Sequence, residues 1–499
     1  MADFKDKYDV IVIGAGIGGL TCGALLAKNG LSVLVTEQHS RPGGYCTSFR
    51  RKGFVFDAGF DTTFECEKGG IIYDTLDELG LTGEIQFIRL ASPMRVIGGD
   101  YDILVTSEFI EELKRVFPGE STSIDNFMGE CTALASEMKN LSAVPPDLLG
   151  FTGKLGLMMK FLLKSPRMRQ YSGKSTGEVL NTFFKDPRLK AFYGTVVPFG
   201  PKAMALLLMM ILGGEPVSYY PRGGAQALAD TFARGVTKNG GELALKTMVT
   251  RILVEGGAAA GVELANGNKI VSRFVVSNAD GRETFLKLIG EQHLAPKLVK
   301  EIAETDLSEP YLLVSLGVDL DLRAMGFDGT SIIYNRCDDL DKIFSTELDH
   351  CYLCIKMHSL RDASQAPDNM ATVQLSTSLP YDYMGNWKRE KDGTCGKEYT
   401  QLKESVADRL IVAAEKFIPG LTNHIVVRDV ATPLTFERYT LNCQGANMGW
   451  FPAPGGRMRS QKTPIKNLYQ AGAWTYPGPS LYAVVPSGRN AAQLVLQEA

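Results

Sequence analysis

The sequence YDVIVIGAGIGGLTCGALLAKNGLSVLVTEQHSRPGG at residues 8–44 decides the fold. Its first apolar run, residues 10–13, is continuous and β-branched, which is typical of a parallel strand buried on both faces. Gly14, Gly16 and Gly19 follow at G-x-G-x-x-G spacing. In a strand–turn–helix unit these glycines allow a tight turn, close approach of the backbone to a pyrophosphate, and close packing of helix on strand.

The residues after the glycines supply the other parts of such a unit. A helix is expected over residues 17–29, with Gly30 just past its end. Its free N–H groups and positive dipole end would face phosphates. Residues 31–36 predict the second strand, and Glu37 follows at the place where a carboxylate accepts hydrogen bonds from ribose hydroxyls. A glycine-rich turn in an unrelated α/β protein would leave this acid unexplained, so the sequence predicts a dinucleotide site.

The residues that follow Glu37 indicate whether the dinucleotide site is one for FAD or one for a nicotinamide dinucleotide. RPGG at residues 41–44 lies just past the acid, and FVFDAG follows at residues 54–59. This pattern resembles the FAD-binding start of the amine oxidase and phytoene desaturase superfamily, where a Gly-Gly pair lets the chain pass close to the FAD. Many amine oxidase relatives have Arg after the pair, whereas this chain has Tyr45. The resemblance implies FAD, with a departure at Tyr45.

Later motifs resemble the polyene branch of that superfamily. YYPRGG at residues 219–224 is similar to the segment at which these chains return to the FAD-binding domain. TPLTFERYT at residues 432–440 and NLYQAGAWTYPG at residues 467–478 are similar to patterns in carotenoid isomerases and retinol saturases. The resemblance covers both ends and most of the chain between them.

The resemblance implies an α/β fold with two discontinuous domains. One is a Rossmann-type FAD-binding domain, with a parallel sheet and a three-stranded β-meander. The other is an α+β substrate-binding domain, whose antiparallel or mixed sheet is also indicated by alternating apolar and polar residues between 311 and 380. The first takes residues 1–65, 217–305 and 425–499; the second takes residues 66–216 and 306–424, with 145–216 as a helical, membrane-facing candidate.

FAD is expected to be held without a covalent bond, because no histidine or cysteine lies in an evident flavinylation motif, and no metal is expected. The residues implied to contact FAD are Gly14, Gly16, Gly18, Gly19, Glu37, Gln38, Arg41, Gly43, Gly44, Tyr45, Arg222, Gly223, Val249, Asp280, Gly472, Ala473, Ser480, Leu481 and Tyr482. The chain has only one dinucleotide fingerprint. We therefore expect either an external electron donor or acceptor, or a redox-neutral reaction.

The C-terminal motif departs from the family where the flavin ring is expected. Carotenoid desaturases and isomerases usually have a glycine-rich run with one proline there, whereas residues 479–486 read PSLYAVVP. Proline fits a helix only in its first turn or just before it, so the last helix is expected to begin near Pro486. Tyr482 would then project toward the substrate.

Tyr482 and Glu437 are the candidate catalytic residues if a double bond must be protonated. The competing interpretation is a packing aromatic for Tyr482 and a salt bridge, to Arg438 or another cation, for Glu437. Cys351 and Cys354 form a C-x-x-C in a strand-like context, and are interpreted as buried thiols, with a redox pair as the alternative.

The amino-acid composition indicates which binding partners and which cellular compartment are compatible with this chain. A net charge of −3 argues against nucleic-acid binding, which needs a basic excess. Nine scattered cysteines, with no apolar leader and no long uncharged apolar run, predict a reduced, cytoplasmic protein without a spanning helix. Residues 145–169 interleave Leu, Met and Phe with Lys and Arg, with no acid after Asp147. This segment is either a basic helix on the inner, anionic membrane surface or a helix whose apolar face is core.

These patterns predict an FAD-dependent oxidoreductase or isomerase that acts on carbon–carbon double bonds of a lipophilic polyene or isoprenoid: a carotenoid cis–trans isomerase, a saturase or a desaturase. One alternative is a flavin amine oxidase, which needs an aromatic cage that Tyr219, Tyr220, Trp450 and Tyr482 would supply. The other is a non-catalytic FAD-binding protein.

Overall fold

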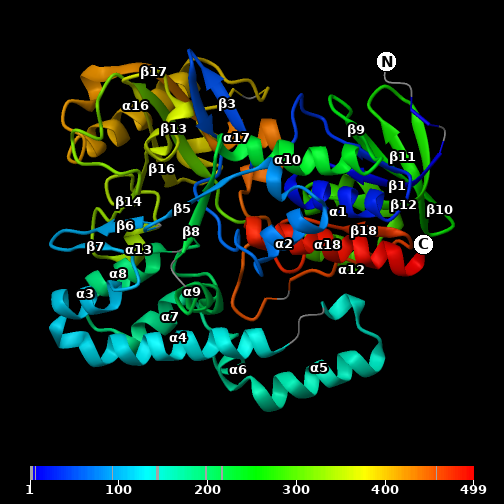
Figure 1. The fold of residues 1–499 in the computed structure, drawn as a ribbon, viewed down its shortest axis with the longest axis horizontal. Helices are drawn as coiled ribbons and strands as arrows, with labels where there is room; N and C mark the ends of the chain where they lie inside the picture. Colours follow the sequence, from blue (N-terminus) through cyan, green and yellow to red (C-terminus); the bar gives the residue numbers. More distant parts are fainter. Residues whose placement is uncertain are drawn as a thin grey trace.

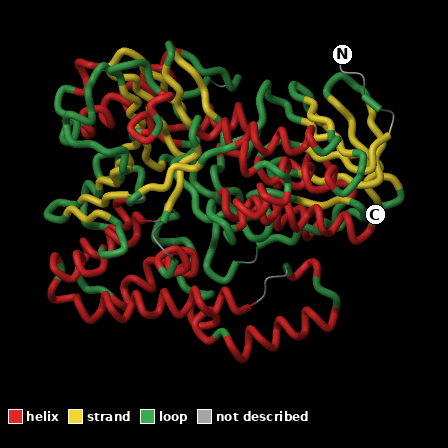
Figure 2. The backbone as a smooth tube through the Cα atoms, in the orientation of Figure 1, coloured by secondary structure: helices red, strands yellow, loops and turns green. Residues whose placement is uncertain are grey.

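Two sheet-based parts lie above a layer of helices (Figure 1). In Figure 2 the strands gather at the upper left and at the right, and helices make up the lower edge. The computed structural model describes residues 4–5, 7–92, 94–141, 145–196, 199–214, 217–390, 392–456 and 458–499. Residue 216, where the sequence places a domain boundary, lies outside these residues. None of the helices within the described ranges is both long and apolar enough to cross a membrane.

The first sheet is the Rossmann-type sheet that the N-terminal stretch predicts. Its strand order is β10 (Val249–Glu255), β11 (Ala258–Leu264), β12 (Lys269–Ser277), β1 (Lys7–Ile13), β2 (Val33–Thr36) and β9 (Glu242–Ala244), with β18 (Leu468–Gln470) beside β12. Strands β9, β2, β1, β12 and β18 are parallel. Strands β10, β11 and the first half of β12 form the antiparallel meander.

Both faces of this sheet are covered, which explains the uninterrupted apolar run of β1. Val10 and Val12 belong to one core, whose helices are α1 (Ile17–Lys28), α2 (Ile71–Glu78), α10 (Gly224–Lys238) and α18 (Leu481–Glu498). Ile11 and Ile13 belong to the opposite core, with the meander and α12 (Pro296–Glu304). A strand buried on both faces has no position left for polar alternation.

The second sheet is mixed, in agreement with the sequence. Its order is β17 (Ile425–Ala431), β13 (Tyr311–Val318), β16 (Ala371–Ser378), β15 (Leu353–Lys356), β14 (Ser331–Tyr334), β6 (Met94–Ile97) and β7 (Asp102–Leu104). All neighbours are antiparallel except β14 and β6. One face packs against α16 (Lys397–Ala414). Strand β17 extends this sheet into the range 425–499, which the sequence assigns to the other domain.

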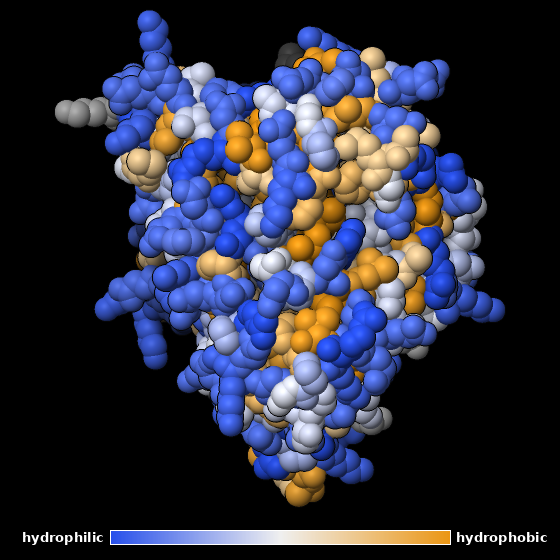
Figure 3. Space-filling model, turned by 90° about the vertical axis from the view of Figure 1, so that its left-hand side faces the viewer, coloured by the Kyte–Doolittle hydropathy of each residue, from blue (hydrophilic) through white to orange (hydrophobic). Residues whose placement is uncertain are grey.

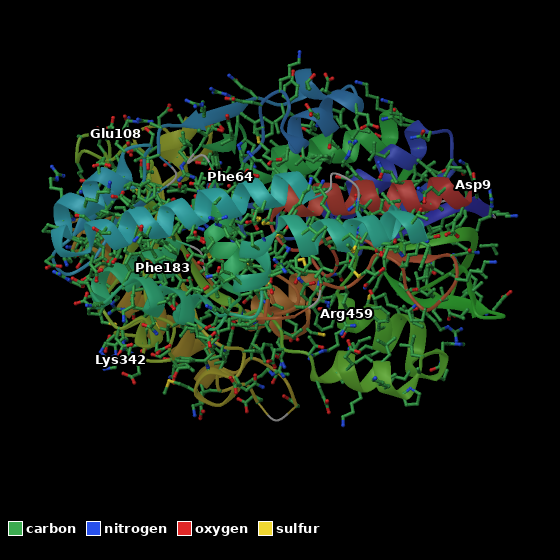
Figure 4. The ribbon with its side chains drawn as sticks, turned by 90° about the horizontal axis from the view of Figure 1, so that it is seen from below. Asp9, Phe64, Glu108, Phe183, Lys342 and Arg459 are labelled. Atoms are coloured by element: carbon green, nitrogen blue, oxygen red, sulfur yellow. The ribbon has the colours of Figure 1, made fainter. Side chains whose placement is uncertain are left out.

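Two small antiparallel pairs link the parts, and the helical layer lies below them. The pairs are β3 (Ser48–Arg51) with β4 (Phe54–Asp57), and β5 (Phe87–Leu90) with β8 (Ser218–Pro221). The layer contains α3 (Phe109–Val116), α4 (Ser121–Leu141), α5 (Phe151–Lys164), α6 (Pro166–Tyr171), α7 (Thr176–Phe183), α8 (Pro187–Val196) and α9 (Ala205–Leu212). Helices α3, α4 and α7–α9 share a core that reaches the second sheet. Figure 4 shows α4 and α5 crossing the underside.

The expected start of the last helix is wrong. Helix α18 begins at Leu481, not near Pro486, and Pro486 lies inside it. Proline at this position cannot donate to the carbonyl four residues earlier, that of Tyr482, so one helical hydrogen bond is lost. The helix tolerates this because Pro486 is only six residues from the start and the first turns are packed in the first core by Leu481, Val484 and Val485.

Candidate functional site

The glycines of the first turn surround a single side chain, that of Asn278. A Cβ added at Gly16 would lie 2.7 Å from Asn278 Nδ2, and one at Gly18 would lie 2.8 Å from Asn278 Oδ1. Gly472, which follows β18, crowds the same amide. Asn278 is not among the residues that the sequence predicts. Its position, directly after a strand of the parallel sheet and at the same edge as the glycine turn, is the signal that could have found it.

Glu37 lies at the end of β2, as predicted for the ribose-binding acid. Its Oε2 accepts a hydrogen bond from the Ala15 N–H at 2.9 Å, and its Oε1 accepts one from the His39 N–H at 2.8 Å. The half-buried carboxylate has further lone pairs. Helix α1 has no side-chain cap and no acid in its first turn, so its first N–H groups remain available to an anion. These groups fit the ribose and phosphates of a dinucleotide.

The second glycine pair runs beside the first turn. The Gly43 N–H donates to the Ala15 carbonyl at 2.8 Å. Gly43 and Gly44 have φ of 124° and 61°, in the left-handed region that favours glycine. A Cβ at Gly44 would meet only the Gly16 Cα, at 3.7 Å, so this side of the loop is open. A flat ligand that passes the first turn can therefore continue along the pair.

Two polar side chains near this pair have partners within the protein. The Arg41 guanidinium donates to the Ser48 carbonyl at 2.7 Å, and the Gln38 amide donates to the Tyr439 carbonyl at 3.1 Å. The two bonds tie this segment to β3 and α17 (Pro433–Thr440), and a role toward a cofactor stays a prediction for both side chains.

Arg222 and Gly223 precede α10, whereas Val249 belongs to the first sheet, and a contact of these three residues with a cofactor stays a prediction. Arg222 and Gly223 are exposed before α10, and the Gly223 N–H donates to Asp362 at 2.6 Å. Val249 is buried at the start of β10. The segment just before it donates from Thr247 N–H to the Glu37 carbonyl at 2.7 Å, which puts Val249 on the Glu37 side.

Asp280 is buried at the start of the short helix α11 (Gly281–Glu283). Its two carboxylate oxygens accept the N–H groups of Glu283 at 2.8 Å and Cys443 at 2.7 Å. Burial raises the pKa of this carboxyl to about 6, although both N–H groups act in the opposite direction. Asp280 therefore ties the end of β12 to the loop around Cys443.

The start of α18 faces the same edge of the sheet. Ser480 caps the helix with φ of 90° and ψ of 158°, a conformation that is almost restricted to glycine. Gly472, with Ala473 after it, approaches the helix through a hydrogen bond from its N–H to Ser487 Oγ at 2.9 Å. Gly18 packs closely on the chain at Gly472, because a Cβ on Gly18 would lie 2.8 Å from the Gly472 Cα. Gly488 of α18 has a packing role too, because a Cβ there would overlap the Gly18 carbonyl.

The two predicted catalytic side chains have different neighbours. Tyr482, the second residue of α18, forms an edge contact with Phe64, with ring centroids 5.8 Å apart. Burial raises its pKa, which keeps the phenol protonated near neutral pH. Glu437, in α17 (Pro433–Thr440), accepts hydrogen bonds from the Tyr381 hydroxyl at 2.5 Å and the Gln444 N–H at 2.9 Å. Tyr381, and not Arg438, is thus the side chain that engages Glu437.

The four aromatic residues proposed for an amine-binding cage do not pair with one another in the described structure. Tyr220 stacks on His358, and Trp450 meets Trp474. Tyr219 is buried on β8, and Tyr482 contacts Phe64. The cage interpretation therefore has no support from their packing.

A different aromatic group lies between the two sheets. The rings of Tyr45 and Tyr311 both contact Phe436, at centroid distances of 5.6 and 4.5 Å. The Tyr311 hydroxyl donates to the Ala58 carbonyl at 2.9 Å. A Cβ on Gly59 would lie 2.6 Å from that hydroxyl, so only glycine fits there. The group connects the second glycine pair to β13.

A buried polar cluster, which the sequence did not reveal, joins the two parts. Asp57 accepts hydrogen bonds from Ser48 Oγ at 2.5 Å, the Tyr220 hydroxyl at 2.6 Å and the Ala225 N–H at 2.9 Å. His358, at the start of α14 (His358–Arg361), lies with its Nδ1 3.7 Å from Asp57. The YYPRGG segment at residues 219–224, where the chain returns to the first sheet, therefore has a structural role. It brings Tyr220 and the start of α10 to Asp57.

These features define a protein of the Rossmann-type dinucleotide-binding class, with its site at the carboxyl edge of a parallel sheet. The family model "NAD(P)-binding Rossmann-like domain" matches residues 12–79. Cyclohexylamine oxidase from Brevibacterium oxydans IH-35A shares the fold, with a TM-score of 0.63 and 16% identity over 98% of this chain and 99% of that chain.

Curated relatives narrow the class to a family. A chloroplastic prolycopene isomerase of Daucus carota is 30% identical over 99% of this chain and 81% of its own length. An all-trans-retinol 13,14-reductase of Danio rerio is 26% identical over 94% of this chain and 82% of its own length. The chain belongs to the phytoene desaturase-like family, in the branch of carotenoid isomerases and retinol saturases, and is an enzyme of that family.

Proposed function

We propose that the protein is an FAD-dependent enzyme that changes the geometry or saturation of carbon–carbon double bonds in a lipophilic polyene. The observation that carries the proposal is the alignment of the glycine turn, Glu37 and the second glycine pair along one edge, next to an aromatic group at the second sheet. When bound, flavin would supply the redox chemistry. The protein would orient the substrate and exclude water.

The described residues support non-covalent binding. The start of α1, Glu37 and the open side of Gly44 would hold the phosphates, the ribose and the chain between them. The start of α18 would face the flavin end, where its N–H groups stabilise negative charge. Tyr482, protonated and adjacent to this helix start, would donate a proton at its hydroxyl. An external partner would donate or accept the electrons of a net reduction or oxidation, whereas an isomerisation would be redox-neutral and need no net electron transfer.

The test is anaerobic incubation of the purified, flavin-loaded protein, oxidised and dithionite-reduced, with tetra-cis-lycopene, all-trans-retinol, oleic acid and putrescine. Products are separated by chromatography. We expect a polyene to be isomerised, saturated or desaturated, and putrescine to be recovered unchanged. Oxidation of putrescine alone would replace the proposal with the amine oxidase alternative, and no product from any compound would favour a non-catalytic flavoprotein.

We further propose that α5 delivers the enzyme to an anionic lipid surface, from which a lipophilic substrate would enter. None of its residues is buried, and its exposed apolar side chains are Phe151, Leu155, Met158, Met159, Leu162 and Leu163. This absence of burial contradicts the interpretation of α5 as a core helix. Lys154, Lys160 and Lys164 are interleaved with these side chains, and a basic, apolar helix suits an anionic surface. In Figure 3 hydrophobic atoms reach the lowest tip of the molecule, the level at which Figure 1 draws α5.

Flotation with vesicles tests this surface. The protein should float with phosphatidylcholine–phosphatidylglycerol vesicles and much less with phosphatidylcholine alone. Replacing the three α5 lysines by glutamine should weaken binding about 100-fold, since each basic residue near an anionic surface contributes about 1 kcal/mol. The matched control is Lys297→Gln, because Lys297 is an exposed lysine on α12, outside the proposed surface. Equal flotation of the lysine variant and the wild type would refute the docking surface.

A further inference from the structure

An open pocket of about 640 Å³ lies at the amino edge of the first sheet, at the opposite end of the strands from the glycine turn. Strand β1 begins at Lys7, which lines the pocket, and ends at Ile13, directly before Gly14. Since a strand rises about 3.3 Å per residue, about 20 Å separate the pocket from the expected cofactor site. It lies at the C-terminal end of α18, which Figure 1 draws at the right, and is separate from the site described above.

Three basic side chains line this pocket, and three separate segments supply them. Lys7 begins β1, and Arg273 lies on the neighbouring strand β12. Lys466 comes shortly before β18 and is fixed by its backbone. Its N–H donates to the Gly257 carbonyl at 3.0 Å, and its carbonyl accepts from the Ala259 N–H at 2.8 Å. The sheet thus brings together three cations that are far apart in the sequence.

The acid in the pocket wall, Glu498, does not neutralise these cations. Its carboxylate lies 3.5 Å from Lys462 Nζ, and Lys462 is not part of the wall. Arg273 has two contacts, because its Nη1 lies 3.7 Å from Asp9 Oδ1 and its Nη2 donates to the Ala499 carbonyl at 3.0 Å. A guanidinium has five N–H groups, so these contacts orient Arg273 and leave donors for a ligand.

The two lysines of the wall carry the unmatched charge. Lys7 and Lys466 are exposed, and within the part of the chain that the structure describes neither forms an ion pair within 4.0 Å. Ala260, Val271 and Phe274 give the same pocket an apolar wall. A concave surface with an excess of one charge and low-dielectric walls concentrates its field, so this pocket attracts anions.

A buried hydroxyl group gives a second, independent indication of a ligand. Ser272 also lines the pocket, and its side chain is only 3% exposed. Its Oγ has no hydrogen-bond partner among the described residues. Buried hydroxyl groups are normally hydrogen-bonded, because an unpaired one loses its bonds to water without replacement. An anion in the pocket would accept a hydrogen bond from this hydroxyl.

We propose that this pocket binds the phosphate group of a small phosphate monoester. Lys7, Arg273, Lys466 and the Ser272 hydroxyl offer donors from several segments. A phosphate monoester has three terminal oxygens and close to two negative charges at neutral pH, whereas a carboxylate has two oxygens and one charge. The apolar wall would contact the organic part, and the volume lies in the range of about 300–1,000 Å³ that is usual for small-molecule sites. The proposal goes beyond the proposed function and does not depend on it.

The test is calorimetric titration of the flavin-loaded protein, at neutral pH and low ionic strength, with phenyl phosphate, benzoate and benzyl alcohol. Phenyl phosphate should bind about tenfold more tightly than benzoate, the difference that one further charge-assisted hydrogen bond of about 1.4 kcal/mol makes, and benzyl alcohol should not bind. Lys7→Gln and Lys466→Gln should each weaken phenyl phosphate binding about tenfold. Lys397→Gln, an exposed lysine on α16 beside the second sheet, is the matched control and should change nothing.

Ser272→Ala separates a ligand-binding role of the hydroxyl from a structural one. It should weaken phenyl phosphate binding about fivefold, yet leave the midpoint of thermal unfolding without ligand unchanged, because the hydroxyl has no partner to lose. A lowered midpoint with unchanged affinity would assign Ser272 to the fold and overturn its part in the site. Dihexanoyl phosphatidic acid tests the source of the phosphate: tighter binding of this lipid than of phenyl phosphate would overturn a soluble ester in favour of a lipid head group.

Equal affinity for phenyl phosphate and benzoate, equal effects of Lys466→Gln and Lys397→Gln, or no binding of any anion would overturn the proposal. Its failure is separable from that of the proposed function, because the pocket lies away from the glycine turn and the flavin content of every variant should equal that of the wild type. If a polyene is converted but phenyl phosphate does not bind, only the phosphate site fails.

Discussion

Gly16→Val should leave the purified protein almost free of flavin. A Cβ at Gly16 would lie 2.7 Å from the Asn278 amide nitrogen, and the two methyl groups of valine would project into the turn where the phosphates are expected. Since the turn allows the closest approach of backbone to pyrophosphate, we expect the flavin content to fall about tenfold or more. The measurement is the ratio of flavin to protein absorbance, with released flavin identified by chromatography.

Gly129→Val is the matched control for this substitution. Gly129 is exposed on α4, and a Cβ added there meets no atom within 4 Å. This variant should retain the wild-type flavin content, and circular dichroism should show both variants folded. A folded Gly16→Val protein that is fully loaded with flavin would disprove the assignment of the turn to the cofactor.

The sequence predicts those parts of the fold that are determined by residues close to one another in the chain. Residues 10–13 are typical of a strand with both faces buried, which the structure confirms, and the glycine spacing and Glu37 are what a phosphate and a ribose need. The alternation between 311 and 380 gives the second sheet, because one face packs on α16 and the other has polar positions such as Ser376. Each of these signals lies within a few residues of the feature that it predicts.

The two misjudged boundaries depend on contacts that are distant in sequence. The start of α18 is set by packing of its first turns in the first core and against Phe64, which outweighs the bond lost at Pro486. Strand β17 joins the second sheet because β13 offers it a free edge, with Val314 opposite Val430. A short apolar run does not reveal which sheet edge will accept it.

The Asp57 cluster was missed for the same reason, whereas the position of Asn278 directly after a parallel strand was a signal that could have been used. Asp57, Tyr220 and His358 come from three separate parts of the chain, and no spacing relates them. The sequence marks Asp57 only as part of FDAG and Tyr220 only as part of YPRGG. Asp57 and Tyr220 interact because the fold brings β8 close to β4, and only the three-dimensional structure shows this.

Asp57→Ala should be among the most destabilising single substitutions in this protein. The carboxylate is 1% exposed and accepts three hydrogen bonds, from Ser48, Tyr220 and Ala225. Each buried donor left without an acceptor costs about 1–3 kcal/mol, so we expect the free energy of unfolding to fall by roughly 3 kcal/mol or more. The measurement is urea unfolding of the flavin-loaded protein, supported by the midpoint of thermal unfolding.

Two further variants serve as controls for the loss of unfolding free energy in Asp57→Ala. Asp57→Asn keeps one oxygen acceptor, and the Ser48 and Tyr220 hydroxyls can rotate to accept from its amide, so its loss should be clearly smaller. Asp429→Ala removes an exposed ion pair to Arg51 that also joins the two parts, and such pairs contribute about 0–1 kcal/mol. If Asp57→Ala were no more destabilising than Asp429→Ala, the donors would have other acceptors, and Asp57 would not be the group that holds β4, β8 and α10 together.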